Sequence, residues 1–88
     1  MLMITRIEEE NTIRTLKLQG KLRGPWVDEL RAVCVAAASP SVLLRLDLAA
    51  VTFVDAAGVD CLRELMKEGI PVVASSGFVA ALLDLPAV

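Results

Sequence analysis

Apolar residues along this chain follow two spacings in turn, and each spacing predicts a different element. Stretches in which alternate residues are apolar, or in which Leu and Val run almost unbroken, predict strands. The expected strands are Met1–Ile7, Ile13–Gln19, Val42–Leu48 with an extension through Val54 after a kink at Ala49–Ala50, and Ile70–Ala74. A polar turn over Glu8–Thr12 joins the first two. The later strands are apolar enough to be covered on both faces, as parallel sheets are.

Between these strands, apolar residues recur at three- and four-residue steps, which predicts helices. The expected helices are Pro25–Ala38, Gly58–Lys67 and Phe78–Leu85, with a loop over Gly20–Gly24 before the first and stops at Gly69 and Pro86. The buried stripe of the first helix is Val27, Leu30, Cys34 and Ala37. This order predicts one α/β domain over residues 1–88, with an N-terminal β-hairpin and helices packed against a mixed, mostly parallel sheet.

Composition narrows the classes of function. The chain has 88 residues, a net charge of −2, one Trp, no Tyr and no His, and its Lys and Arg are scattered. No basic face is expected for nucleic acid, and no apolar run reaches the roughly 18 residues that insertion into a membrane needs. The N-terminus lacks the order of a secretion signal, so the cytoplasm is the expected compartment.

The sequence offers no set of catalytic or metal-binding residues. Cys34 and Cys61 lie on apolar helix faces without metal-site spacing, so we expect buried, reduced thiols; a disulfide is the less favoured alternative. There is no histidine to act as a base, and no Gly-rich phosphate loop. We therefore expect a protein that is not an enzyme, with no cofactor and no metal.

Two loops should meet at the carboxyl edge of the parallel strands. Asp55 is placed to cap the second helix by accepting hydrogen bonds from the N–H of Ala57 or Gly58. Gly58 should permit close approach of backbone, either to the first helix or to a partner. At the other loop, Ser75 or Ser76 should cap the third helix; a weak anion site at Ser75, Ser76 and Gly77 is the alternative.

The segment Leu44–Leu65 has the form LxLDLxxVxFVD followed by two small residues and Gly. It resembles the STAS family, the domain of bacterial anti-sigma factor antagonists, and the resemblance implies a STAS-like fold. In that family the position of Ala56 carries the Ser or Thr that a partner kinase, itself an anti-sigma factor, phosphorylates. Neither Ala56 nor Ala57 has a hydroxyl, and the chain stops where longer members add a strand and a helix.

The resemblance implies a regulatory protein-interaction module that is not switched by phosphorylation at the usual position. Its expected partner is an anti-sigma factor of the kinase-like class. The expected partner-binding residues are Arg23, Gly24 and Trp26 with Asp55, Ala56, Ala57, Gly58, Val59 and Asp60. The loop is either fixed in the binding-competent form or the remnant of a lost site. Alternatives are a small accessory subunit of a membrane-transport assembly, an anion- or nucleotide-binding α/β domain, and a homodimer that covers the short C-terminus.

Overall fold

The computed structural model describes residues 2–10 and 12–84, which form four strands and three helices. In chain order these are β1 (Leu2–Glu10), β2 (Ile13–Leu22), α1 (Pro25–Ala37), β3 (Leu43–Val54), α2 (Ala56–Lys67), β4 (Val72–Ser75) and α3 (Gly77–Leu83). The strands make one sheet in the order β1-β2-β3-β4, in which β1 is antiparallel to β2 and the other pairs are parallel. The predicted α/β class and mixed sheet are confirmed.

Strand pairing moves several predicted boundaries. β1 extends to Glu10, which pairs with Ile13, so the hairpin turn is shorter than the predicted Glu8–Thr12. β2 extends to Leu22 because its last residues pair with the end of β3, so most of the predicted Gly20–Gly24 loop is strand. The predicted helix end at Leu85 lies outside the described residues.

The predicted kink at Ala49–Ala50 does not break β3 but appears as a bulge. Lys17 pairs with Asp47, whereas Gln19 pairs with Ala50, so β3 carries an extra residue here. Asp47 lies at this irregularity, and its Oδ1 accepts a hydrogen bond from Ala49 N–H at 3.0 Å. The acidic residue inside the apolar strand therefore has a local partner, as its position required.

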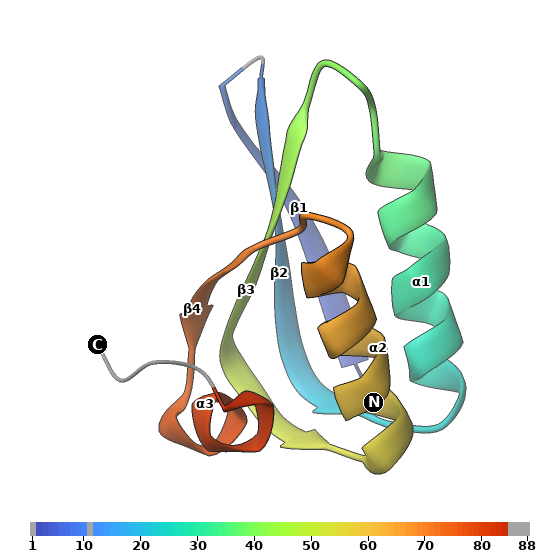
Figure 1. The fold of residues 1–88 in the computed structure, drawn as a ribbon, viewed down its shortest axis with the longest axis vertical. Coiled ribbons are helices and arrows are strands. Elements are labelled where there is room, and N and C mark those ends of the chain that lie inside the picture. The colour runs from blue at the N-terminus through green and yellow to red at the C-terminus, as the bar shows by residue number, and fades with distance from the viewer. Residues whose placement is uncertain (1, 11, 85–88) are drawn as a thin grey trace.

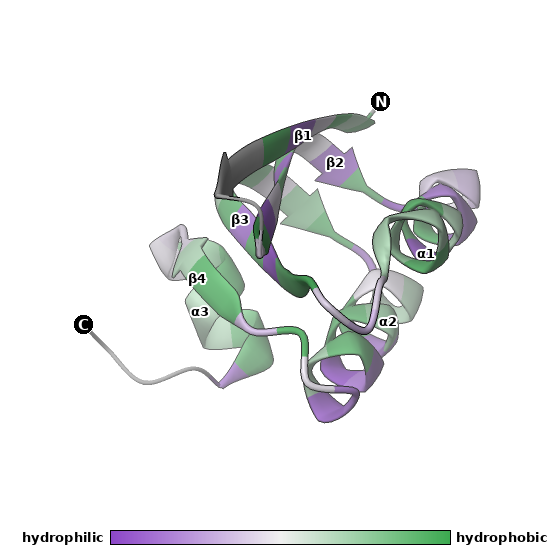
Figure 2. Cartoon of the chain, turned by 90° about the horizontal axis from the view of Figure 1, so that it is seen from above, coloured by the Kyte–Doolittle hydropathy of each residue, from purple (hydrophilic) through white to green (hydrophobic). Residues whose placement is uncertain are grey.

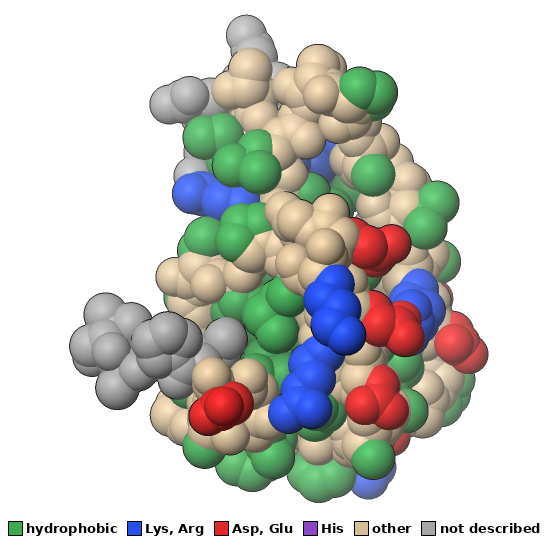
Figure 3. All heavy atoms as spheres, viewed as in Figure 1, with side chains coloured by type: hydrophobic (Ala, Val, Ile, Leu, Met, Phe, Trp, Pro, Cys, Tyr) green, Lys and Arg blue, Asp and Glu red, His purple; other side chains and the backbone are tan. Residues whose placement is uncertain are grey.

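All three helices pack on one face of the sheet, as the views in Figures 1 and 2 show. The predicted stripe of α1 is buried, and α2 adds Gly58, Cys61, Leu62 and Leu65 to the same core. Arg31 of α1 and Glu64 of α2 form an ion pair at 2.8 Å across the helix interface. Figure 3 views this face, where Lys, Arg and acidic side chains gather over α2.

The prediction that β3 is covered on both faces is wrong. Leu44, Leu46 and Leu48 are buried under the helices, whereas Leu43 remains 48% exposed on the other side. That second face is largely polar: Thr15 is buried there, and its Oγ1 accepts a hydrogen bond from Arg45. The apolar density of β3 therefore reflects burial of one side of the strand, combined with aliphatic residues left on the other.

Within the described residues, α1 is the longest helix at 13 residues, and no helix has the length and apolar character to span a membrane.

Candidate docking site at the carboxyl edge of the sheet

The parallel strands β2 and β3 end together at the bottom of Figure 1, where Leu22 pairs with Val54, and each leads into a helix there. β4 runs in the same direction but ends earlier, with Ser75 level with Leu48, before it leads into α3. The segment Arg23–Trp26 leads into α1, Asp55 into α2 and Ser76 into α3. Asp55 contacts the loop before α1, whereas Ser76 lies against Val51, partway along β3, so the two loops predicted to meet lie at different levels of the sheet. The sheet thus brings together residues more than thirty positions apart in the sequence.

Asp55 is the residue that joins two of these loops. Its Oδ1 accepts a hydrogen bond from Gly58 N–H at 2.7 Å, which is the predicted N-cap of α2. Its Oδ2 accepts a second bond from Gly24 N–H at 3.0 Å, in the loop before α1. Because Asp55 N–H also donates to the Leu22 carbonyl at 3.1 Å, the end of β3 is fixed to the end of β2 through both backbone and side chain.

These contacts set the charge state of the carboxyl group. The Gly24 amide, then the Gly58 amide, and then the positive charge of Arg23 lower the pKa of Asp55 below its ordinary value of 3.8. An ionised carboxylate also interacts favourably with the positive end of α2. Asp55 is therefore a fixed negative charge at this edge at neutral pH.

Gly24 supplies the backbone conformation that this contact needs. Its φ of 55° with ψ of −133° belongs to a region that residues with a Cβ rarely adopt. The turn continues with Val27 N–H donating to the Gly24 carbonyl at 3.1 Å, which opens α1. The resemblance placed Gly24 and Asp55 among the partner-binding residues, but the hydrogen bond between them could not be predicted, since no local pattern connects residues 31 positions apart.

Gly58 is not exposed at this edge, which corrects its prediction as a partner-binding residue. It is buried, and a Cβ there would lie 2.7 Å from Val54 Cγ1 and 3.0 Å from the Leu22 carbonyl oxygen. The close approach predicted for this glycine is therefore to the ends of β2 and β3, not to α1 or a partner. Only a hydrogen atom fits, which lets α2 start directly against the sheet.

The remaining predicted residues divide into exposed and packed ones. Val59 is half-buried against the core, and Trp26 is half-buried among Leu2, Ile4 and Val33, so its main contacts are within the protein. The exposed ones form a surface that we call the docking edge: Arg23, Gly24, Ala56, Ala57 and Asp60. The Gly24–Asp55 hydrogen bond holds its two halves together.

Two aromatic side chains at the same end of the strands were not identified from sequence. Phe53, near the end of β3, is 39% exposed, and Phe78, in the first turn of α3, is 48% exposed. Exposed aromatic side chains are frequent anchors of protein interfaces. Their positions next to the two helix caps were the available signal, but an apolar residue beside a strand end predicts core packing equally well.

Ser76 caps α3, as predicted for Ser75 or Ser76. Its Oγ accepts a hydrogen bond from Val79 N–H at 3.3 Å and donates to the Val51 carbonyl at 3.4 Å. This hydroxyl is thus engaged in holding α3 on β3, and Ser75 belongs to β4. An anion site at Ser75, Ser76 and Gly77 stays a prediction.

The two cysteines are buried free thiols between α1 and α2, as predicted. Burial raises the pKa of Cys34 to about 11, and burial also raises that of Cys61. Both therefore stay protonated at neutral pH and act as small apolar side chains. Among the described residues there is no group of three or more His, Cys, Asp or Glu side chains that could hold a metal ion.

The sequence matches no protein-family model and has no significant match among curated proteins. The structure, in contrast, is similar to solved ones. One is the crystal structure of an antisigma-factor antagonist STAS domain from Rhodobacter sphaeroides, with a TM-score of 0.58 and 14% identity over 91% of this chain and 90% of that one.

Another is an uncharacterized protein of the DUF3478 family with a SpoIIAA-like fold, from Shewanella loihica PV-4. It matches with a TM-score of 0.53 and 12% identity, over 91% of this chain and 72% of that one. Likeness at such identities concerns the path of the backbone. The fold expected from the Leu44–Leu65 pattern is thereby confirmed: the chain has the STAS-like, SpoIIAA-like fold.

Proposed function

We propose that this chain is a cytoplasmic regulatory module that binds a protein partner through the docking edge, in the manner of an anti-sigma factor antagonist. The observation that carries the proposal is the double hydrogen bond of Asp55, to Gly24 and Gly58, which presents Ala56 and Ala57 exposed on a fixed helix start. Small exposed residues on a rigid turn allow close approach of another protein surface, and they supply no group for chemistry.

The proposal includes a fixed binding state. Ala56, the first residue of α2, has no oxygen to receive a phosphoryl group. The neighbouring hydroxyls have internal roles: Ser76 holds α3, and Thr52 Oγ1 donates to the Gly20 carbonyl at 3.2 Å. A phosphate at position 56 would stand next to the Asp55 carboxylate, whose charge it would oppose. The alanine adds no second negative charge beside Asp55.

Affinity capture from the native cell tests the docking edge. We expect the wild-type protein to capture an ATPase-fold kinase, and Ala57→Arg and Asp60→Lys to reduce capture by about tenfold or more. Both residues are exposed, so the variants should fold. Lys67→Glu is the control, because it reverses an exposed charge at the other end of the same helix. Capture that survives both changes would show that the partner does not bind at the docking edge.

The identity of the captured protein separates the alternatives. A kinase-like anti-sigma factor supports the proposal, whereas a transporter ATPase identifies an accessory subunit of a transport assembly. Incubation of the captured kinase with ATP should leave the wild-type chain unlabelled and label Ala56→Ser. Label on wild-type Thr52, Ser75 or Ser76 would mean that the switch has moved, and would contradict the fixed state.

A further inference from the structure

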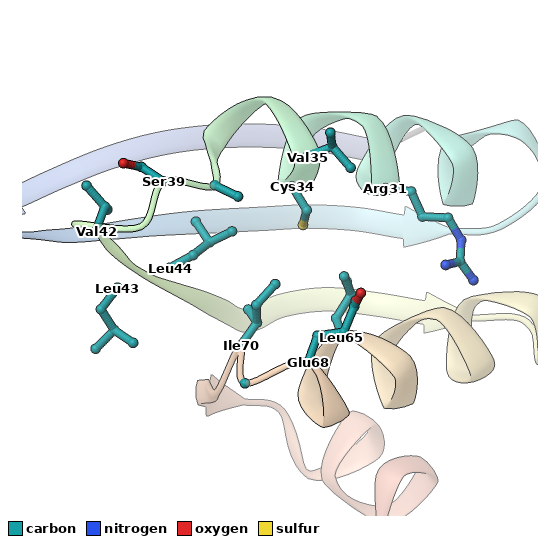
Figure 4. Close-up of a pocket in the computed structure, with 12 residues that line it drawn as sticks. Arg31, Cys34, Val35, Ser39, Val42, Leu43, Leu44, Leu65, Glu68 and Ile70 are labelled. Atoms are coloured by element: carbon teal, nitrogen blue, oxygen red, sulfur yellow. The ribbon is translucent and has the colours of Figure 1, made fainter.

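The amino end of β3 carries a second feature, at the opposite end of the strand from the docking edge. A groove of about 430 Å³ lies between the last turn of α1, the start of β3 and the turn after α2. Figure 4 shows Val35 and Cys34 on α1, Val42 just before β3, Leu43 and Leu44 on β3, and Ile70 around it. The lining is mainly aliphatic, and Val35 is 78% exposed at its rim.

Beside this groove, no strand among the described residues pairs with the start of β3 on the side where β4 lies further along. β3 runs for 12 residues, but β4 has only four, and the first pair between them is Leu46 with Val72. Leu46 N–H donates to the Pro71 carbonyl, at 2.9 Å, where the ladder begins. The residues of β3 before Leu46 therefore form an open strand edge within the described structure.

The backbone of Leu44 faces that open edge. Leu43 N–H donates to the Thr12 carbonyl on the β2 side, and alternate residues of a parallel strand bond to opposite neighbours. The backbone N–H and C=O of Leu44 therefore point towards the side of β4, like those of Leu46. Continuing the ladder would require a donor at position 71, where proline has no N–H.

The geometry points to a strand-addition site: an extended, apolar segment of a partner protein pairs with β3 at Leu44 and places an aliphatic side chain in the groove. Main-chain hydrogen bonds supply affinity in this mode, and a pocket for alternate side chains supplies specificity. The Leu44 N–H and C=O lack a backbone partner among residues 2–10 and 12–84, so an added strand satisfies them. The free backbone selects a strand over a compact apolar ligand, which would leave both groups unpaired.

The test uses the isotopically labelled full chain and peptides that alternate Thr and Val around a central Val, Leu, Ile or Phe. We expect at least one peptide to shift the Leu44 amide resonance and to slow its hydrogen exchange by about tenfold or more. Leu46 N–H, already bonded to Pro71, should change little. The same peptide with every amide N-methylated keeps its side chains but loses its donors, and should bind about tenfold weaker or worse.

A pair of matched variants locates the site. Val35→Glu, at the exposed rim of the groove, should weaken binding of the peptide by about tenfold. Val73→Glu, at an exposed valine of β4 that does not line the groove, should leave binding unchanged. Equal binding of the methylated peptide would overturn the proposal in favour of an apolar ligand site. Absence of binding by every peptide at about 1 mM, or protection of Leu44 by self-association alone, would also overturn it.

Discussion

Two turns that lead from a strand into a helix, β3 to α2 and β4 to α3, cap the helix N-terminus with different side chains. Each has a capping side chain that accepts from the N–H three residues later: Asp55 from Gly58, and Ser76 from Val79. In each, that third residue is buried against the sheet. At α2 it must be glycine, whereas at α3 a valine fits.

The two turns differ in how firmly their capping side chains fix them to the rest of the protein. Asp55 accepts a second bond, from Gly24, and ties α2 to the loop before α1. Ser76 uses its remaining donor on Val51, within the strand that α3 already covers. The charged, acceptor-only carboxylate can join two loops by their N–H groups, which a hydroxyl with one proton does less well. The turn that carries the docking edge is therefore the more constrained of the two.

The largest expected effect comes from filling the space at Gly58. Gly58→Ala should lower the free energy of unfolding by about 1–3 kcal/mol, because its Cβ meets Val54 and the Leu22 carbonyl. Gly77→Ala in α3 is the control, since no heavy atom lies within 4 Å of a Cβ there. Urea unfolding measures both. If the two variants lose equal stability, α2 does not depend on close contact with the strand ends.

Removal of the two caps should have a smaller effect, and an unequal one. Ser76→Ala should lower the free energy of unfolding by about 1 kcal/mol, the usual loss for a cap. Asp55→Ala should cost more, because it removes bonds to two loops. Hydrogen exchange at Gly24 should speed up in Asp55→Ala and stay unchanged in Ser76→Ala. Unchanged exchange at Gly24 in both variants would argue against the link between the loops.

The smallest expected effect is on stability at low pH. The pKa of Asp55 is lowered in the folded protein, chiefly by the Gly24 amide, so the unfolded chain binds the proton more tightly. Its contribution to stability is present above pH 3.8 and is lost as the pH falls through the lower, folded value. The melting temperature of Asp55→Asn should therefore fall less steeply than that of the wild type as the pH is lowered. Ser76→Ala, which removes no titrating group, should follow the wild-type slope.

Much of the architecture could be predicted because it depends on local pattern. Val27, Leu30, Cys34 and Ala37 lie on one face of any helix, so their burial followed from spacing alone. The boundaries of the strands were harder to predict. β2 reaches Leu22 only because β3 lies alongside it, and residues 20–22 by themselves resemble a loop.

The sequence alone determined the order of elements, the cap of α2 at Asp55 and the buried stripe of α1, since these rest on contacts within a few residues. Only the tertiary structure decided that Gly24 bonds to Asp55, that Gly58 faces the Leu22 carbonyl, and that one face of β3 stays open. These features join segments far apart in the chain, and their geometry depends on how the sheet twists and where its ladders stop. For the docking edge, the residues were visible in the sequence, but the rigidity that makes them a surface was not.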